Sequence, residues 1–333
     1  MDIKEILKNL TDAVGIGNIR EATDIAGEYL SRFCDVSYGS DLGVIGRITG
    51  ERDYTLMLEA HIDQIGFIVT DVDDKGFLTV STCGGIDLRA LPSRQVDIHG
   101  KKTVRGVFCS TPPHLSEEDV TFDKISDMKI DSCLGEKAKD IISLGDYVTF
   151  SSSFNELSGD KLCSKSFDDR AACAVLIELA SRFEGKKPPV NLVFCLSDME
   201  EIGLRGAKTS SFRISPDEAI AIDVSFADGP DINPEDCGKM CKGAMIGISP
   251  VADRAISDKL IRLAKEKNIP YQTEVMGKST GTDADIISVT KSGIRTGLVS
   301  IPLRNMHSDC EIISVSDIIS VCDLLEEYIK AVE

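Results

Sequence analysis

The feature that most constrains the fold of this chain is a nearly unbroken run of apolar residues at 190–196, which reads Val-Asn-Leu-Val-Phe-Cys-Leu. A strand with apolar side chains on both faces is typical of a sheet that is covered by helices on both sides. Further strands are predicted at 44–49, 54–60, 219–224 and 296–301. Helical periodicity occurs around and between them, at 1–33, 169–183, 204–212, 253–267, 282–292 and 315–332. This alternation predicts an α/β fold with helices on both faces of the sheet.

The segment 64–161 differs in character from the rest of the chain. Its short β-rich pieces are separated by loops that contain Gly, Pro and acidic residues. The pieces at 65–70 and 77–81 flank the turn Asp-Asp-Lys-Gly at 73–76, which predicts a β-hairpin. We therefore predict one α/β domain that is built from both ends of the chain, 1–63 and 162–333, and that is interrupted by a β-rich insertion at 64–161.

The net charge of the chain limits its partners. It contains 37 Lys and Arg against 55 Asp and Glu, a formal net charge of −18 at pH 7. Such a surface repels phosphate backbones and anionic lipids but attracts divalent cations, so neither nucleic acid nor a membrane is an expected partner. The amino terminus is amphipathic rather than a signal peptide. Together with 11 scattered cysteines and no Cys-x-x-Cys pair, this predicts a cytoplasmic protein with reduced thiols.

Acidic and histidine residues follow several predicted strands. His61 comes directly after the run at 54–60, and Asp63 lies two residues further, on the same side of an extended chain. Asp63 can therefore contact the far nitrogen of His61 and set its tautomer, as carboxylates do for metal-bound imidazoles. Asp168 and Asp169 stand at the start of the helix 169–183, where a carboxylate either caps the helix or binds a metal.

The strand 190–196 leads directly into Asp198, Glu200 and Glu201. Adjacent carboxylates repel each other unless a cation or a proton offsets their charge. They also diverge in direction, so that one can bind a metal while the other faces a substrate; a solvated acidic loop is the alternative. Asp223 and His307 belong to or follow the next strands. Because ligands of open α/β sheets bind at the carboxyl ends of strands, we expect these residues to converge.

The converging residues offer oxygen and nitrogen donors and no thiolate. Five such ligands, one of them from the Glu pair, fit two borderline divalent metal ions. Zinc is the first expectation, with cobalt or manganese as alternatives.

Six short motifs, taken in order, resemble those of the tetrahedral (TET) and glutamyl aminopeptidase family. They are Glu-Ala-His-Ile-Asp at 59–63, Phe-Asp-Asp-Arg at 167–170, Met-Glu-Glu-Ile-Gly at 199–203, Ile-Asp-Val at 222–224, Gly-Thr-Asp-Ala at 281–284 and Ile-Pro-Leu-Arg-Asn-Met-His-Ser at 301–308. The resemblance extends from about residue 5 to residue 330. Members of this family are cytosolic dinuclear metallo-aminopeptidases, and some carry the labels endoglucanase or deblocking aminopeptidase.

The resemblance implies a role for each candidate ligand. Asp168 would bridge two metal ions. His61 and Asp223 would complete the site of one ion, and Glu201 and His307 would complete the site of the other. Each subunit would therefore hold two divalent ions, most readily zinc.

The same resemblance implies the reaction and the architecture. Glu200 would act as general base on a water molecule between the two ions, and Asp63 would orient His61, so that amino-terminal residues are hydrolysed from short peptides. The fold would be a mixed-sheet, phosphorylase/hydrolase-like catalytic domain with an inserted small β-barrel-like domain at 64–161 that serves dimerisation. The dimers would assemble into a tetrahedral dodecamer that encloses the active sites.

Other functions are open at this point. A related metal-dependent deacylase or carboxypeptidase-like hydrolase would use the same chemistry, and blocked and free peptides would separate these enzymes. A glycoside hydrolase would need two carboxylates around a sugar bond and no metal. A scaffold protein that kept the fold without the activity is disfavoured, because the ligands and the base are all present.

Overall fold

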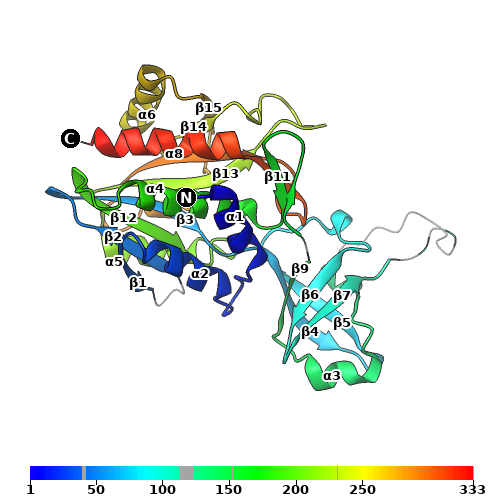
Figure 1. Ribbon diagram of the computed structural model, residues 1–333. Helices are drawn as coiled ribbons and strands as arrows, with labels where there is room; N and C mark the ends of the chain where they lie inside the picture. Colours follow the sequence, from blue (N-terminus) through cyan, green and yellow to red (C-terminus); the bar gives the residue numbers. More distant parts are fainter. Residues whose placement is uncertain are drawn as a thin grey trace.

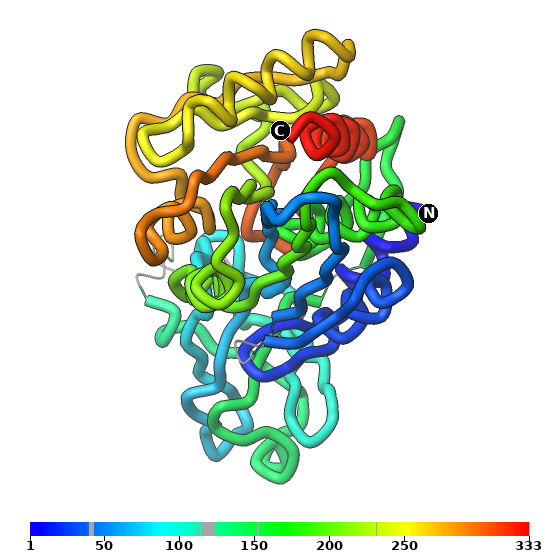
Figure 2. The backbone as a smooth tube through the Cα atoms, turned by 90° about the vertical axis from the view of Figure 1, so that its left-hand side faces the viewer, coloured from blue at the N-terminus to red at the C-terminus, as the bar shows by residue number. Residues whose placement is uncertain are grey.

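The computed structural model describes residues 1–39, 43–110, 112, 114, 124–151, 153–230 and 232–332. Figure 1 shows a larger α/β part that contains both chain termini and a smaller β-barrel that projects from it. Figure 2, turned by 90°, shows the barrel segments at the lower end of the molecule and the last helix near its upper end. The mixed sheet and the separate barrel confirm the fold class that the sequence and its family resemblance predict.

An eight-stranded sheet forms the centre of the larger part. Its order is β1 (Asp35–Tyr38), β2 (Val44–Ile48), β12 (Val190–Ser197), β3 (Arg52–His61), β13 (Glu218–Phe226), β16 (Arg295–Leu303), β14 (Ala244–Ile248) and β15 (Tyr271–Val275). Strands β3, β12, β13 and β16 run parallel, whereas β2 and β14 are antiparallel to their neighbours β12 and β16. Every residue of β12 except Asn191 is buried, which explains its nearly continuous apolar sequence.

Helices cover both faces of this sheet. One face packs against α1 (Ile3–Asp12), α2 (Glu21–Leu30), α4 (Phe167–Arg182), α6 (Arg254–Lys267) and α8 (Val315–Lys330) in the largest apolar cluster. The other face packs against α5 (Arg205–Ile214) and the short α7 (Ala284–Ile287) in a smaller cluster. Alternate residues of β3 serve the two faces, with Leu56 and Leu58 in the first cluster and Met57 in the second. The smaller helical cover leaves the second face accessible near the carboxyl ends of its strands.

The barrel is closed by six short strands. They are β4 (Gly66–Val72), β5 (Phe77–Cys83), β8 (Ile130–Asp131), β7 (Thr103–Phe108), β6 (Gln95–His99) and β9 (Tyr147–Phe150), with α3 (Ala138–Ile141) at one end (Figure 1). The barrel has its own apolar core, in which the Phe67 ring packs edge-on against Phe108 and Phe150, at 5.1 and 5.6 Å between ring centres. The predicted hairpin is present as the antiparallel pair β4–β5.

A small three-stranded sheet connects the two parts of the fold. It consists of β10 (Asn155–Glu156), β11 (Lys161–Ser164) and β17 (Glu311–Ser314). Strand β11 leads from the barrel side into α4, and β17 leads into α8, so this sheet holds the start of α4 close to the segment that precedes α8.

Some predicted elements differ from the structure. The region 1–33 forms two helices because the chain turns at Gly17, which has a φ of +58°. The predicted helix at 282–292 is wrong in length: α7 ends at Ile287, since Val289 and Thr290 are poor helix formers and Lys291 has a left-handed φ of 55°. The sequence pattern does not predict β14, whose short apolar run is interrupted by Gly247, or β15, which mixes polar with apolar side chains.

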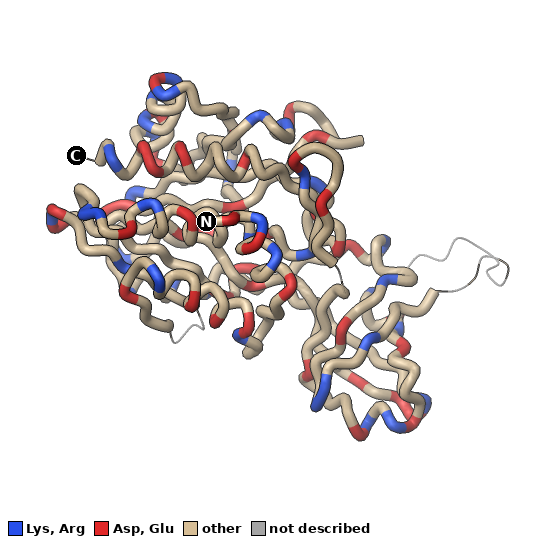
Figure 3. The backbone as a smooth tube through the Cα atoms, viewed as in Figure 1, with Lys and Arg blue, Asp and Glu red and all other residues tan. Residues whose placement is uncertain are grey.

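Charged residues are spread over both parts of the molecule (Figure 3). No disulfide links any of the 11 cysteines, in agreement with the reduced thiols that the sequence predicts. In the described ranges, no helix combines the length and the apolar character that crossing a membrane would require.

Candidate active site

A cavity of about 390 Å³ lies at the carboxyl ends of the central strands. Strand β3 lies between β12 and β13 and is parallel to both, so the residues that end or follow these strands reach the same edge of the sheet. The predicted ligands and the predicted base all line this cavity: His61, Asp168, Glu200, Glu201, Asp223 and His307. The structure therefore brings together residues from both ends of the chain.

Asp168 lies between the two histidines. Its Oδ1 is 3.2 Å from Nε2 of His61, and its Oδ2 is 3.2 Å from Nε2 of His307. The same nitrogen of His307 lies 3.5 Å from Oε1 of Glu201. Burial acts to raise the pKa of Asp168, but hydrogen bonds from His307 and His61 hold this pKa below its usual range. One carboxylate therefore faces two nitrogen donors, an arrangement that suits a ligand shared by two cations.

Asp63 lies on the far side of the His61 ring. Its Oδ1 is 3.4 Å from Nδ1 of His61. The same carboxylate accepts hydrogen bonds from the backbone N–H groups of Glu200, at 3.0 Å, and of Glu201, at 3.2 Å. Asp63 thus contacts the histidine and also holds the start of the loop that carries both glutamates.

Glu200 and Glu201 follow β12 directly. Oε2 of Glu200 is 3.9 Å from Nε2 of His61. Burial raises the pKa of Glu200 to about 7, and burial together with the charge of Asp168 raises the pKa of Glu201 to about 9. Asp198, the third acidic residue of this segment, is buried outside the cavity lining and accepts a hydrogen bond from the N–H of Met199 at 2.7 Å. Two adjacent and largely buried carboxylates are unfavourable unless protons or cations offset their charge.

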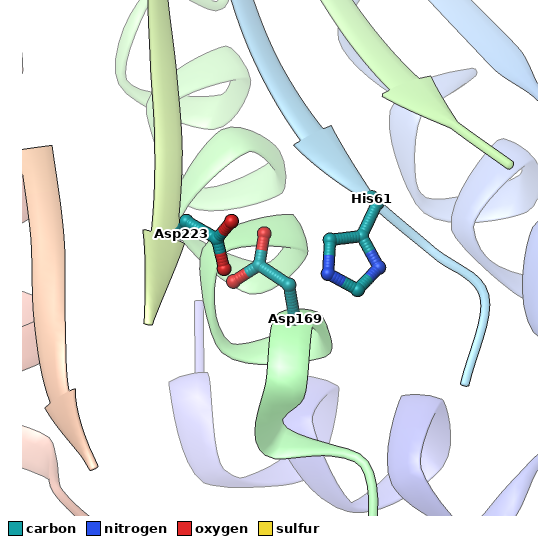
Figure 4. A group of neighbouring side chains, drawn as sticks. All are labelled: His61, Asp169 and Asp223. Carbon is teal, nitrogen blue, oxygen red and sulfur yellow. The ribbon is translucent and has the colours of Figure 1, made fainter. Parts of the chain in front are cut away.

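Asp169 is a further candidate ligand. Figure 4 shows its carboxylate facing that of Asp223 beside the His61 ring, and one ligand atom from each of the three lies within 4.8 Å of the others. Asp169 is completely buried, and neither of its oxygens has a hydrogen-bond partner within the described part of the chain. The capping role that the sequence allows is therefore wrong for Asp169. Burial raises its pKa well above the usual range, so that a proton or a cation must accompany it.

Known proteins resemble this chain in sequence over most of its length. The pattern of the M42 glutamyl aminopeptidase family matches residues 43–324. The chain belongs to this family. A protein of Acetivibrio thermocellus that is named as an aminopeptidase is 34% identical to this M42 chain over 334 residues, with 98% of both chains covered. The lysyl aminopeptidase of Pyrococcus furiosus is 28% identical over 98% of this chain and 96% of its own length.

Solved aminopeptidase structures match this M42 chain along nearly its whole length. The TET aminopeptidase of a marine sediment Thaumarchaeota archaeon has a TM-score of 0.94 at 29% identity, with 99% of this chain and 96% of that chain covered. The TET1 peptidase of Pyrococcus horikoshii has a TM-score of 0.87 at 28% identity, with 99% of this chain and 100% of that chain covered. The chain is therefore an enzyme of the metallo-aminopeptidase class, which hydrolyses peptide bonds, as the family resemblance predicts.

The cavity fits the metal dependence of the M42 family. Among the described residues, its lining contains five carboxylates and two histidines, but no lysine or arginine. Three sets of donors have ligand atoms within 4.8 Å of one another: His61 with Asp169 and Asp223, His61 with Glu200 and Glu201, and Asp168 with Glu201 and His307. So much buried negative charge is unfavourable unless cations compensate it. All donors are oxygen or nitrogen atoms, which suits borderline divalent ions.

Glu311 is a buried site residue of this M42 enzyme that the sequence did not single out. Its Oε1 accepts a hydrogen bond from the N–H of His307 at 3.0 Å, and its Oε2 accepts one from the N–H of Asp168 at 3.1 Å. It therefore fixes the backbone of both residues relative to each other. Both partners are backbone groups, so the only available signal was its position four residues after His307.

A buried carboxyl pair, Glu59 and Asp283, lies behind His61 and is not indicated by the sequence pattern. Glu59 precedes His61 by two residues on β3 and shares its face of the sheet. The Glu59 side chain hydrogen-bonds Asp283, which in turn accepts a hydrogen bond from Oγ of Ser197 at 3.0 Å. Burial and the charge of Asp283 raise the pKa of Glu59 well above its usual range, so the pair holds a proton. Both residues lie within motifs that resemble the family, at 59–63 and 281–284, but those motifs alone assign them no role.

Proposed function

We propose that this chain is a dinuclear metal-dependent aminopeptidase that removes amino-terminal residues from short peptides. The observation that supports this most is the position of Asp168, whose two carboxylate oxygens each lie 3.2 Å from a histidine nitrogen. In this proposal Asp168 is shared by two divalent ions. His61 and Asp223 complete one site, and Glu201 and His307 complete the other. Zinc is the first candidate, and cobalt or manganese also suits these donors.

The side chains of the cavity would divide the work of peptide hydrolysis. Two bound cations would lower the pKa of a water molecule and polarise the scissile carbonyl. Glu200 accepts the proton of the attacking water and passes it to the leaving amine, a role that contributes about 10²–10⁴-fold to the rate. Asp63 positions Glu200 through its backbone N–H and faces Nδ1 of His61.

We also propose a division of the chain into a catalytic domain, 1–63 and 162–333, and an inserted dimerisation domain, 64–161. The separate apolar core of the barrel supports an inserted unit. The TET1 peptidase of Pyrococcus horikoshii can assemble into a tetrahedron or a large octahedral shell, and the similarity to it supports assembly of dimers of this chain into a tetrahedral dodecamer. Light scattering would test this: a dodecamer mass supports the proposal and a monomer mass contradicts it. The cytoplasmic location stays a prediction from the sequence.

The function is tested with protein that is stripped by a chelator and then loaded with zinc, cobalt or manganese. We expect hydrolysis of free aminoacyl p-nitroanilides and short peptides only in the loaded protein, no hydrolysis of the same substrates with an acetylated amino terminus, and two ions per chain by elemental analysis. Equal hydrolysis of acetylated substrates would favour a deacylase. Chelator-resistant cleavage of cellulose would favour a glycoside hydrolase.

The names of the relatives do not decide which amino-terminal residue is removed. The family is described as glutamyl aminopeptidases, whereas the Pyrococcus furiosus relative is a lysyl aminopeptidase. These two side chains carry opposite charges at neutral pH. The preference of this chain must therefore follow from its own cavity.

A further inference from the structure

The cavity contains one carboxylate that the proposed reaction does not use. Glu274, on the edge strand β15, lines the same cavity as His61, Asp168 and Glu200. It is partly buried, so part of its side chain is open to a ligand. Its position places a carboxyl group in the wall of the cavity. Burial raises the pKa of this group, and hydrogen bonds from Ser225 and Ser300 act against that shift.

Two serines hold this carboxylate in place. Oγ of Ser300 donates to Oε2 of Glu274 at 3.1 Å, and Oγ of Ser225 donates to Oε1. An ionised carboxylate has about four acceptor positions, so two hydroxyl donors leave positions free for a further donor. The serines therefore fix the carboxylate without neutralising its charge.

The same serines place Glu274 next to the proposed metal ligands. Ser225 follows Asp223 by two residues on β13 and so lies on the same face of the sheet. Ser300 is the direct partner of Asp223 on the parallel neighbour β16, at a strand spacing of about 4.8 Å. Glu274 is thus anchored in the cavity wall within about one side-chain length of Asp223.

The charges of the cavity leave Glu274 uncompensated. If two divalent ions bind, their four positive charges are shared among Asp168, Glu200, Glu201 and Asp223, which line the cavity, and Asp169, which is buried beside Asp223. Of the residues that the structure describes, no lysine or arginine lines the cavity to balance Glu274. A partly buried and unpaired carboxylate favours a cationic ligand and disfavours an anionic one.

The remaining wall suits a long side chain with an apolar stem. Phe226, Met276, Leu298 and Met306 line the same cavity as Glu274. Lysine and arginine carry three or four methylene groups below a cationic end, and the methylenes pack well against apolar surfaces. An apolar wall with a fixed carboxylate therefore matches both parts of a basic side chain.

We propose, on the basis of the function proposed above, that Glu274 receives the cationic end of an amino-terminal lysine or arginine, so that peptides beginning with a basic residue are the preferred substrates. The competing assignment for the same carboxylate is the free α-amino group, which every substrate carries. The two assignments differ in one measurable respect, because only the first makes the effect of Glu274 depend on the substrate side chain.

The test compares kcat/KM for lysyl, arginyl, leucyl and glutamyl p-nitroanilides with metal-loaded wild-type protein and its Glu274→Gln variant. We expect the wild type to prefer lysyl and arginyl over leucyl substrates and to disfavour glutamyl substrates. Glu274→Gln should lower the lysyl-to-leucyl ratio of kcat/KM about 10- to 100-fold. The control Glu266→Gln removes the same charge from the exposed face of α6 and should leave this ratio unchanged. The metal content of each variant is measured in parallel.

Three outcomes would overturn the proposal. The first is wild-type protein that hydrolyses leucyl but not lysyl substrates, which leaves the aminopeptidase function intact. The second is a Glu274→Gln variant that loses activity equally on all substrates, because this points to the α-amino group or to the fold. The third is equal inhibition of leucyl hydrolysis by free lysine and by norleucine, which has the same stem without the charge. We expect lysine to inhibit about 10-fold more strongly than norleucine. This measurement uses wild-type protein alone, so a folding defect of the variant cannot affect it. Loaded wild type that hydrolyses no aminoacyl substrate would instead refute the proposed function.

Discussion

The carboxylate of Asp63 accepts a hydrogen bond from the backbone N–H of Glu200 at 3.0 Å. It also faces Nδ1 of His61, so it links the histidine after β3 to the glutamates after β12. Two motifs that are far apart in the sequence are therefore joined through one buried side chain. Any change to this side chain should disturb the ligand and the proposed base together.

Asp63→Asn should lower kcat/KM about 10- to 100-fold, the range seen when a carboxylate behind a metal-bound histidine is changed. One oxygen is replaced by an NH₂ group, which cannot accept a hydrogen bond from a backbone N–H. The control is Asp53→Asn, at the exposed start of β3. Normal kcat/KM in Asp63→Asn would show that the link has no catalytic importance.

Glu200→Gln should lower kcat by about 10²–10⁴-fold, because glutamine cannot accept the proton of the attacking water. Metal content and melting temperature should stay close to those of the wild type, since Glu200 is not one of the five proposed metal ligands. Stopped assays on leucyl and lysyl substrates measure kcat. Elemental analysis measures the metal content, and thermal denaturation measures the melting temperature. Near-normal turnover with full metal content would remove Glu200 from the role of base.

Asp168→Asn should reduce the metal content itself. The shared carboxylate contributes to both proposed sites, so its loss should weaken the binding of both ions. Changing a residue that only contacts a metal ligand typically lowers metal affinity about 10- to 100-fold, and we expect a larger loss here. Dialysis against limiting zinc, followed by elemental analysis, measures this. Glu200→Gln serves as the matched comparison, because it removes a charge from the same cavity while both sites keep their ligands. Two tightly held ions in Asp168→Asn would contradict a shared ligand.

The metal-free protein should become less stable as pH rises. Burial raises the pKa of Glu200 to about 7, of Glu311 to about 8 and of Glu201 to about 9, and the charge of Asp168 adds to the last two shifts. Unfolded glutamates titrate near 4.3, so the folded protein binds more protons than the unfolded protein between these values. The stabilisation is complete below the unfolded pKa and is lost as pH rises through the folded pKa values.

The histidines act in the same direction. Contacts with Asp168 and Glu201 outweigh burial and raise the pKa of His307 to about 9, so its contribution is also lost as pH rises. We expect the melting temperature of chelator-treated protein to fall between about pH 6 and pH 9, and the increase caused by adding zinc to grow over the same range. A melting temperature of the metal-free protein that rises over this range would show that these buried carboxyl groups do not bind protons on folding.

Arg170→Met should destabilise the fold without removing a metal ligand. The buried guanidinium donates to the carbonyl oxygens of Leu10 and Ala13, each at 2.6 Å, and to Ile62 O at 3.2 Å. Loss of these donors leaves buried carbonyl groups unpaired, so the free energy of unfolding should fall by about 3 kcal/mol or more. Urea titration measures this against Arg213→Met, an exposed arginine on α5 that should change stability by less than about 0.5 kcal/mol.

The parts of the fold that could be predicted share a physical cause. Strand β12 is buried on both faces, so its sequence is apolar almost throughout, and its carboxyl end carries the acidic pair Glu200 and Glu201. Strand β15 lies at the sheet edge and contains only partly buried and exposed residues, so its sequence mixes polar and apolar side chains. Glu274 lies on this strand, so the sequence pattern does not indicate that its carboxyl group lines the cavity.

The sequence by itself determined the kinds of donor available to this protein and their places at the ends of strands, because strand burial and the alternation of elements are local properties. The tertiary structure alone decided that Asp169 is buried without a hydrogen bond, that Glu311 binds the backbone of Asp168 and His307, and that Glu274 faces the cavity. These outcomes depend on contacts between segments distant in the chain, and the energy of a carboxylate changes with the burial and the partners that such contacts create.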